Sequence, residues 1–224
     1  MDITLYLCPV GPQDDALLPA LLPRLTTAEQ DRAGRFVVAH ARRTFVIAHA
    51  LLHEALAQAG VTEPVFAENA QGKPRLADPE FHFNLSHTEG LVAVALSRDT
   101  EIGVDVEARR DIPDRDGVAR TVFRPDEIAG MQASADPVAR FFQLWTVKEA
   151  VMKATGLGFS LPPKDIGLSG PEPMLTTLPP AHGTPGEWWL HSEPLGAHWL
   201  ALASRGPAPR VTRHTMRPAD LIPY

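Results

Sequence analysis

The hydrophobic and polar positions of the chain follow strand and helix periods in turn. The segment ITLYLCPV (residues 3–10) predicts an opening strand. Between residues 26 and 59, apolar side chains recur every three or four positions, which predicts one long helix or two in succession. Thr26 followed by Glu29 has the pattern of a capping box, and Gly60 suits the position just after a helix end.

Three segments further along predict consecutive strands. FHFNLSH (81–87) alternates apolar and polar residues, whereas GLVAVALS (90–97) is apolar on both of its faces, as a central strand is. EIGVDVE (101–107) alternates again, and HTEG, which follows the first segment, suits a hairpin connection. Residues 79–107 are therefore expected to form a three-stranded meander.

The C-terminal half predicts helices first and paired strands afterwards. A loop followed by a helix is expected over residues 108–132, and DPVARFFQLWTVKEAVMKATGLG (136–158) predicts the clearest helix of the chain. EWWLHSEP (187–194) and HWLALAS (198–204) predict two strands between turns rich in proline and glycine. Because helix followed by paired strands occurs twice, the pattern allows two similar halves, whose boundary would fall near residue 103.

The composition is ordinary for a soluble globular protein of 224 residues, with 44% hydrophobic and 21% charged residues. A net charge of −6 argues against nucleic acid as a partner, since that binding needs a basic field. The single cysteine, Cys8, permits no intrachain disulfide. The N-terminus lacks the pattern of a secretory signal and no apolar run is long enough for a membrane span, so a cytoplasmic protein without a membrane partner is expected.

The strand 101–107 carries two acids on one face. Asp105 and Glu107 are two residues apart, so their side chains point the same way, roughly 6.5–7 Å apart along the strand. Two ionised carboxylates this close repel, and each raises the pKa of the other. A hard cation such as Mg²⁺ or Mn²⁺ resolves the conflict because it prefers oxygen ligands. A solvated edge strand explains the pair as well, and the pattern alone leaves both interpretations open.

The helix 136–158 offers a third acid. Trp145, Glu149 and Lys153 are spaced four apart, so they share one helix face. If that face packs on the strand of Asp105, three acids and a lysine suit phosphoryl transfer. In such a reaction a metal neutralises phosphate oxygens, an acid takes a proton, and the lysine stabilises the leaving group. The alternative is an ordinary surface ion pair between Glu149 and Lys153.

Ser86 and His87 end the strand 81–87. Adjacent strand residues face opposite ways, so this pair is not expected to be a nucleophile and its base. Where the chain turns, both side chains can still reach a phosphate, with His87 as a cationic or hydrogen-bonding donor. A pair that only caps the turn is the alternative.

Weaker signals lie elsewhere in the N-terminal half. QGKP (71–74) places a lysine at the tip of a turn, and RRT (42–44) places two arginines on a helix face, where phosphate contacts or plain solvation are both possible. His49 and His53 are four residues apart, a possible metal pair, but no third ligand is evident. A structural or exposed role is expected for both histidines.

As a set, these motifs are specific. GKP, FNLSH, IGVDVE and FFQLWTVKEAVMKATGLG, in this order and spacing, resemble the 4′-phosphopantetheinyl transferases of the Sfp type. The resemblance covers nearly the whole chain and is strongest in GVDVE and WTVKEA. It implies an α+β fold of two similar α/β halves, residues 1–103 and 104–224, related by a pseudo-twofold with the active site in the cleft between them. It also implies a monomer.

The resemblance further implies an activity. Such enzymes move the phosphopantetheine arm of coenzyme A onto a serine of acyl or peptidyl carrier proteins in fatty-acid, polyketide and non-ribosomal peptide synthesis. Asp105, Glu107 and Glu149 match the magnesium-binding acids, and Glu149 also matches the general base. Lys153 matches the lysine that assists departure of 3′,5′-ADP. Lys148, in the same motif, is expected to be supportive.

Contacts to coenzyme A are implied for residues of both halves, and His87 is counted as catalytic too. The implied set is Arg32, Arg43, Thr44, Gln71, Gly72, Lys73, Pro74, Ser86, His87 and Lys153. Glu29 falls where the family often has a basic residue such as lysine. Residues 112–125 match the region that contacts the carrier protein. Two other functions stay open: a metal-dependent nucleotide phosphohydrolase, and a non-catalytic coenzyme A-binding adaptor of carrier proteins.

Overall fold

The computed structural model describes residues 1–77 and 81–223. Its helices are α1 (Leu18–Leu21), α2 (Thr27–Gly34), α3 (Ala39–Gln58), α4 (Arg115–Val122), α5 (Pro125–Gln132) and α6 (Pro137–Thr155). Its strands are β1 (Asp2–Pro9), β2 (Phe66–Glu68), β3 (Pro74–Leu76), β4 (His82–Thr88), β5 (Leu91–Ser97), β6 (Ile102–Ala108), β7 (Gly167–Ser169), β8 (Met174–Thr177), β9 (Trp188–Leu195), β10 (His198–Arg205) and β11 (Arg210–Thr215). This mixture confirms the predicted α+β class.

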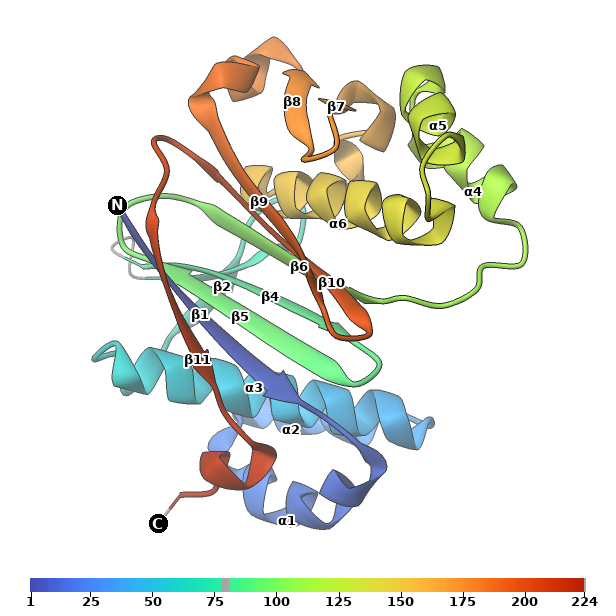
Figure 1. Cartoon of the computed structure of the whole chain (residues 1–224). Coiled ribbons are helices and arrows are strands. Elements are labelled where there is room, and N and C mark those ends of the chain that lie inside the picture. The colour runs from blue at the N-terminus through green and yellow to red at the C-terminus, as the bar shows by residue number, and fades with distance from the viewer. Residues whose placement is uncertain (78–80, 224) are drawn as a thin grey trace.

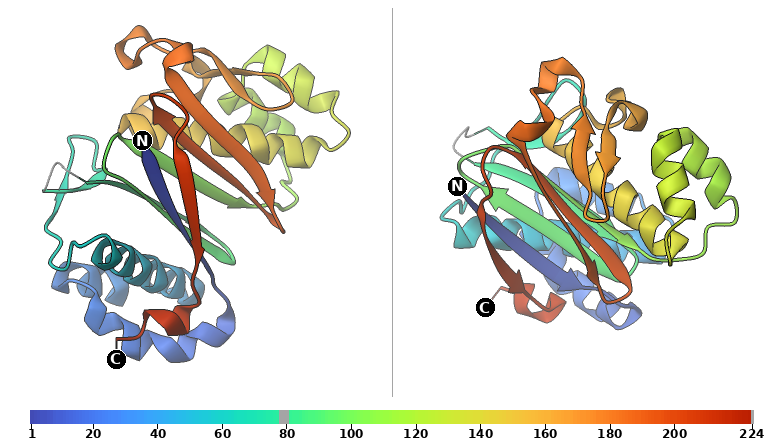
Figure 2. Two further views of the ribbon diagram at one scale, coloured as in Figure 1. Left: turned by 60° about the vertical axis from the view of Figure 1, so that its left-hand side comes forward. Right: turned by 45° about the horizontal axis from the view of Figure 1, so that its top comes forward.

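Two main sheets form the centre of the molecule. The first has the strand order β11-β1-β5-β4 and the second the order β6-β10-β9, while β2-β3 and β7-β8 are small separate hairpins. Figure 1 shows α3 and α2 below the first sheet and α6 above the second. The left view of Figure 2 shows the same separation of the helices, with the strands between them.

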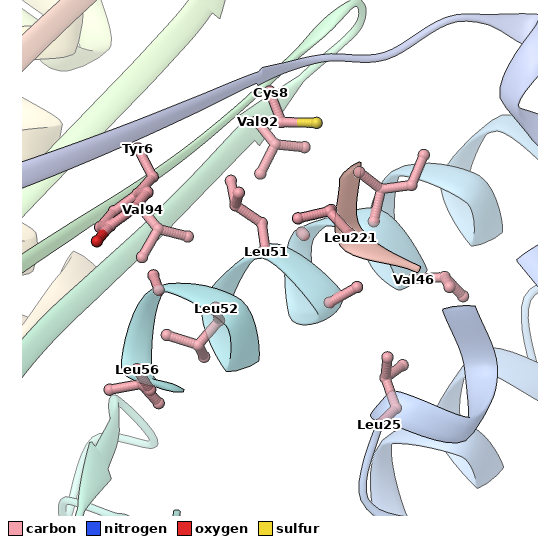
Figure 3. Close-up of a cluster of buried hydrophobic side chains, with 14 of the residues drawn as sticks. Tyr6, Cys8, Leu25, Val46, Leu51, Leu52, Leu56, Val92, Val94 and Leu221 are labelled. Atoms are coloured by element: carbon pink, nitrogen blue, oxygen red, sulfur yellow. The ribbon is translucent and has the colours of Figure 1, made fainter. Parts of the chain in front are cut away.

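Three hydrophobic clusters hold these layers together. One lies between the first sheet and α3, where Val92 and Val94 of β5 face Leu51 and Leu52 of the helix (Figure 3). A second joins the opposite face of that sheet to the second sheet, through alternate residues of β1, β5, β6 and β10. The third lies between the second sheet and α6. The order is therefore helix, sheet, sheet, helix, and β1, β5, β6 and β10 are buried on both faces.

The helix limits follow from the local signals in the sequence. Two helices, α2 and α3, occupy the region predicted as one or two. Thr26 and Glu29 form the predicted capping box: the Thr26 amide donates to the Glu29 carboxylate at 2.7 Å. Gly60 and Gly156, just beyond α3 and α6, have φ of 95° and 73°, a backbone conformation that favours glycine.

The predicted three-stranded meander is wrong. β4 pairs with β5, but β6 pairs with β10, about a hundred residues later in the chain. Asn84, Ser86 and Thr88 of β4 instead accept hydrogen bonds through their side chains from backbone amides of β6, at 2.9–3.2 Å. Residues 79 and 80, the predicted start of the meander, lie outside the described part of the chain.

The division into residues 1–103 and 104–224, with its pseudo-twofold, stays a prediction. Two features cross that boundary: β6 begins at Ile102, and β11 returns from the C-terminal part to pair in parallel with β1. Among the helices of residues 1–77 and 81–223, none combines the length and apolar character of a membrane span.

Candidate active site

α6 approaches β6 closely at Gly103. A Cβ atom on this residue would lie 2.7 Å from the amide nitrogen of Ala154 and closer still to the carbonyl oxygen of Ala150. Only glycine therefore permits this packing. Because side chains alternate along a strand, Asp105 and Glu107 face α6 as Gly103 does. The glycine of the GVDVE motif thus sets the distance between the strand acids and the helix.

Asp105 lies at the centre of a buried polar group. Its Oδ1 accepts hydrogen bonds from Lys153 Nζ at 2.6 Å and from Ser86 Oγ at 2.9 Å. Lys153 also donates to Ser86 Oγ at 3.0 Å, so the three side chains form a closed triangle. The structure thereby brings together one predicted residue from each of β4, β6 and α6.

Glu149 and Glu107 complete the acidic group. Burial raises the pKa of Glu149, and the nearby charges of Asp105 and Glu107 raise it further against the effect of Lys153, so that the pKa is about 7. Burial and Asp105 likewise raise the pKa of Glu107, whose carboxylate accepts a hydrogen bond from Trp145 Nε1 at 3.3 Å. The repulsion predicted for Asp105 and Glu107 is therefore present, and Glu149 shares in it.

The acidic group suits a divalent cation chemically, although it is not arranged as a finished metal site. Among the described residues, no three His, Cys, Asp or Glu side chains form a group that could hold a metal ion directly. Lys153 takes one oxygen of Asp105, whereas the buried Oδ2 has no hydrogen-bond partner within the described part of the chain. A buried carboxylate oxygen without a partner, beside two acids of raised pKa, is what a hard cation would satisfy.

The other side of β4 faces a hollow of about 510 Å³. Arg43 and Thr44 of α3 line it together with His87. Burial lowers the pKa of His87, and the charge of Lys153 lowers it further. Ser86 and His87 thus face different surroundings, as predicted for adjacent strand residues. Arg32 lies over the ring of Phe45, which also lines the hollow, with 5.3 Å from guanidinium to ring centroid.

The GKP loop lies at the C-terminal end of α6. Asn69 holds it there: its side-chain amide donates to the Gly156 carbonyl at 2.8 Å, and its oxygen accepts from the amides of Gln71 and Lys73. Lys73 Nζ pairs with Glu101 at 2.6 Å. Gly72, with φ of 80°, makes the turn, and Pro74 starts β3. The loop therefore borders the group around Lys153, one helical turn away.

Glu29 has a role that its sequence position did not reveal. Its carboxylate accepts from His49 Nδ1 at 2.6 Å and from His53 Nε2 at 2.9 Å, besides capping α2. Burial raises the pKa of Glu29, but the hydrogen bonds from the two histidines outweigh it and the net pKa is lowered. This agrees with the structural role expected for the histidines. The spacing of the two histidines on one helix face was visible in the sequence, but their pairing with Glu29 was not.

Lys148 is fully buried and supports the fold around the site. Its Nζ donates to Glu127 at 2.7 Å and to the carbonyls of Pro163 and Ile166 at 2.9 and 2.8 Å. Burial lowers the pKa of Lys148, whereas the charge of Glu127 acts in the opposite direction. This pair joins α5, α6 and the segment after α6. The supportive role expected for Lys148 fits these contacts.

Part of the region predicted to contact a carrier protein lines a second hollow. This space, about 400 Å³, lies between Ile112 and Val118 on one side and Phe141 and Trp145 of α6 on the other. Glu107 is part of its lining. An apolar surface therefore adjoins the acidic group directly.

Comparison with known proteins identifies the family. The profile of the 4′-phosphopantetheinyl transferase superfamily matches residues 101–203, which include β6 and α6. The 4′-phosphopantetheinyl transferase HetI of Nostoc sp. is 33% identical over 179 residues, 75% of this chain and 76% of HetI. The putative 4′-phosphopantetheinyl transferase slr0495 of Synechocystis sp. is 30% identical over 216 residues, 89% of this chain and 85% of the relative. Psf-1 of Bacillus pumilus, another 4′-phosphopantetheinyl transferase, is 34% identical over 147 residues, 62% of this chain and 61% of psf-1. The resemblance drawn from the motifs is thereby confirmed, and the chain belongs to the 4′-phosphopantetheinyl transferase superfamily.

Proposed function

We propose that this protein transfers the phosphopantetheine arm of coenzyme A to a serine hydroxyl of an acyl or peptidyl carrier protein and releases 3′,5′-ADP. The observation that carries the proposal is the meeting of Asp105, Glu107, Glu149 and Lys153 at the contact between β6 and α6. An acid whose pKa is about 7, beside a lysine and a carboxylate with an unused oxygen, suits phosphoryl transfer to a hydroxyl group.

In this proposal the chain supplies the proton acceptor and the cation for the leaving group. The carrier serine oxygen attacks the phosphorus that bears the pantetheine arm, and Glu149 takes the serine proton, directly or through a water. A pKa near 7 suits a base at neutral pH. The bond from phosphorus to 3′,5′-ADP breaks, and Lys153 offsets the charge that develops on the departing phosphate.

Magnesium is proposed as the metal, with Mn²⁺ able to replace it. Asp105, Glu107 and Glu149 would hold it, and it would supply positive charge to the pyrophosphate oxygens. To serve as a ligand, Asp105 offers its Oδ2, which has no hydrogen-bond partner among the described residues, while Oδ1 stays with Lys153 and Ser86. The Asp105 carboxylate would thus bind the metal through one oxygen and hold Lys153 in place through the other.

The N-terminal half is proposed to hold the rest of coenzyme A. The 3′-phosphate is assigned to the hollow lined by Arg43, Thr44 and His87, with Arg32 nearby. The pyrophosphate is assigned to Ser86 and Lys153. The adenine is assigned to the loop of Gln71, Gly72, Lys73 and Pro74. The carrier protein is assigned to the apolar hollow beside Glu107, which the segment 112–125 helps to line.

Substitution of Glu149 by Gln tests the central role. The variant keeps the side-chain shape and removes the proton acceptor, so the fold is expected to remain while transfer is lost. Mass spectrometry of an apo carrier protein incubated with coenzyme A and Mg²⁺ measures the added arm. Glu63→Gln, in the exposed loop after α3, is the matched control and is expected to transfer normally. Full transfer by Glu149→Gln would contradict the assignment.

A further inference from the structure

Three of the cations assigned to coenzyme A are each paired with a carboxylate. The pairs are Lys153 with Asp105 at 2.6 Å, Lys73 with Glu101 at 2.6 Å, and Arg43 with Asp15 at 2.9 Å. The first of these carboxylates is buried, but the side chains of Glu101 and Asp15 are about half exposed, at 56% and 49%. A half-exposed carboxylate can turn into water at little cost, so these two pairs can open when a ligand arrives.

The pair of Arg43 and Asp15 lies at the hollow assigned to the 3′-phosphate. Only 10% of the Arg43 side chain is exposed, and its buried Nε has no hydrogen-bond partner in the described ranges. Its Nη1 is the atom that contacts Asp15. A guanidinium with a spare buried donor and one replaceable partner is prepared to receive a second, stronger anion.

The segment that carries Asp15 is fixed to the wall of the same hollow. Val10, at the end of β1, donates its amide to the Gly90 carbonyl at 3.0 Å, and both residues line the hollow. The Asp14 side chain then accepts from the Gly11 amide at 2.8 Å and so caps the 3-10 helix Pro12–Leu17. The backbone is therefore held, and the Asp15 side chain is the part that is free to move.

We propose that Asp15 is a competing counter-ion, which the 3′-phosphate of coenzyme A displaces from Arg43. The inference rests on the function proposed above. A carboxylate and a phosphate compete for one guanidinium, so Asp15 lowers the affinity for every ligand with a 3′-phosphate. That includes the product, 3′,5′-ADP. Asp15 thereby favours release of the product while it keeps Arg43 in place between turnovers.

Isothermal titration with Asp15→Asn tests this role. The amide oxygen of Asn still accepts from Arg43, so the guanidinium keeps its orientation and only the competing charge is lost. A half-exposed ion pair contributes up to about 1 kcal/mol, so we expect coenzyme A to bind up to about fivefold more tightly. Binding of 3′-dephospho-coenzyme A is expected to stay unchanged, and product inhibition by 3′,5′-ADP to strengthen by the same factor.

Asp2→Asn is the matched control. It removes the same charge from an exposed pair, Asp2 with Arg210, at the other end of β1. This variant is expected to bind both ligands as the unaltered protein does. It therefore separates a local effect at Arg43 from an effect of net charge.

The outcomes separate the two proposals. Weaker binding of coenzyme A by Asp15→Asn would mean that Asp15 only orients Arg43, and would overturn the inference. Unchanged binding by a variant that still transfers the arm would overturn the inference and leave the proposed function intact. If both ligands bound more tightly by the same factor, the effect would come from the change in net charge, and this result would also overturn the inference. If the unaltered protein binds neither ligand, the proposed function fails with it.

Discussion

Gly103 is the position at which one added carbon atom should separate the two parts of the active site. In Gly103→Ala, the new Cβ would lie 2.7 Å from the backbone nitrogen of Ala154 and nearer still to the carbonyl oxygen of Ala150. Both are backbone atoms of α6, so no side-chain rotation relieves the clash. Ordinary contacts of a carbon atom lie at about 3.5 Å, so α6 has to retreat from β6 by more than about 1 Å.

This displacement acts on the chemistry more than on binding. Glu149 and Lys153 move with α6 while Asp105 stays on β6, and an error of about 1 Å in a reacting geometry costs about 100-fold in rate. The hollow at Arg43, to which we assign the 3′-phosphate, lies against the other sheet and is not displaced. We therefore expect kcat to fall at least about 100-fold with a smaller change in KM for coenzyme A. Overpacking should also lower the free energy of unfolding by about 1–3 kcal/mol.

Steady-state transfer to an apo carrier protein measures both constants, and urea unfolding measures the stability. Gly130→Ala in α5 is the matched control, because a Cβ atom there meets nothing within 4 Å. It should leave kcat unchanged. A Gly103→Ala variant that folds and keeps the original kcat would refute the argument that this glycine sets the distance between Asp105 and α6.

Two further predictions concern buried charges outside the reacting group. Lys148→Met leaves Glu127 without its cation, so urea unfolding should show a loss of about 3–5 kcal/mol, part of which Lys148→Met/Glu127→Gln recovers by removing the stranded charge. A loss in the free energy of unfolding of only about 0.5 kcal/mol, as surface substitutions give, would contradict this. Glu29 has a pKa lowered from 4.5, so its ionised form stabilises the fold above that pH and the contribution declines as the pH falls below it. The stability difference between the unaltered protein and Glu29→Gln should therefore shrink on acidification below pH 4.5, and a difference independent of pH would argue against the role of the two histidines.

The sequence predicted those elements whose signals are local. The period of apolar residues in α6, the capping box at Thr26 and the glycines after α3 and α6 all act within a few residues. Each therefore appears in the structure where the pattern placed it. The face of α6 that carries Glu149 and Lys153 was predicted for the same reason.

Pairing between distant segments was not predictable in this way. β6 has the same alternation whether it pairs with β5 or with β10, so proximity in the chain favoured the wrong partner. The strand β11 joins β1 although the two lie at opposite ends of the sequence. The residues of one strand do not indicate which distant strand it pairs with.

The partners of charged residues were equally hidden. Arg43 was assigned to phosphate binding, but nothing in its surroundings pointed to Asp15, which lies 28 residues earlier in the chain and faces it only in the fold. Glu29 appeared as an exception to a basic pattern, whereas the structure gives it two histidine partners. The sequence predicted which side chains share a face of one helix or strand more readily than which side chains of different elements meet.

The central claim is that the acids of β6 and α6 transfer the arm of coenzyme A to a carrier protein. The most direct measurement is mass spectrometry of apo acyl and peptidyl carrier proteins after incubation with this protein, coenzyme A and Mg²⁺, with EDTA in a parallel reaction. The account predicts that the carrier serine gains the phosphopantetheine mass, that 3′,5′-ADP appears in equal amount, and that EDTA stops both. Release of 3′,5′-ADP without any carrier protein, or coenzyme A binding with no mass gain on any carrier, would contradict it.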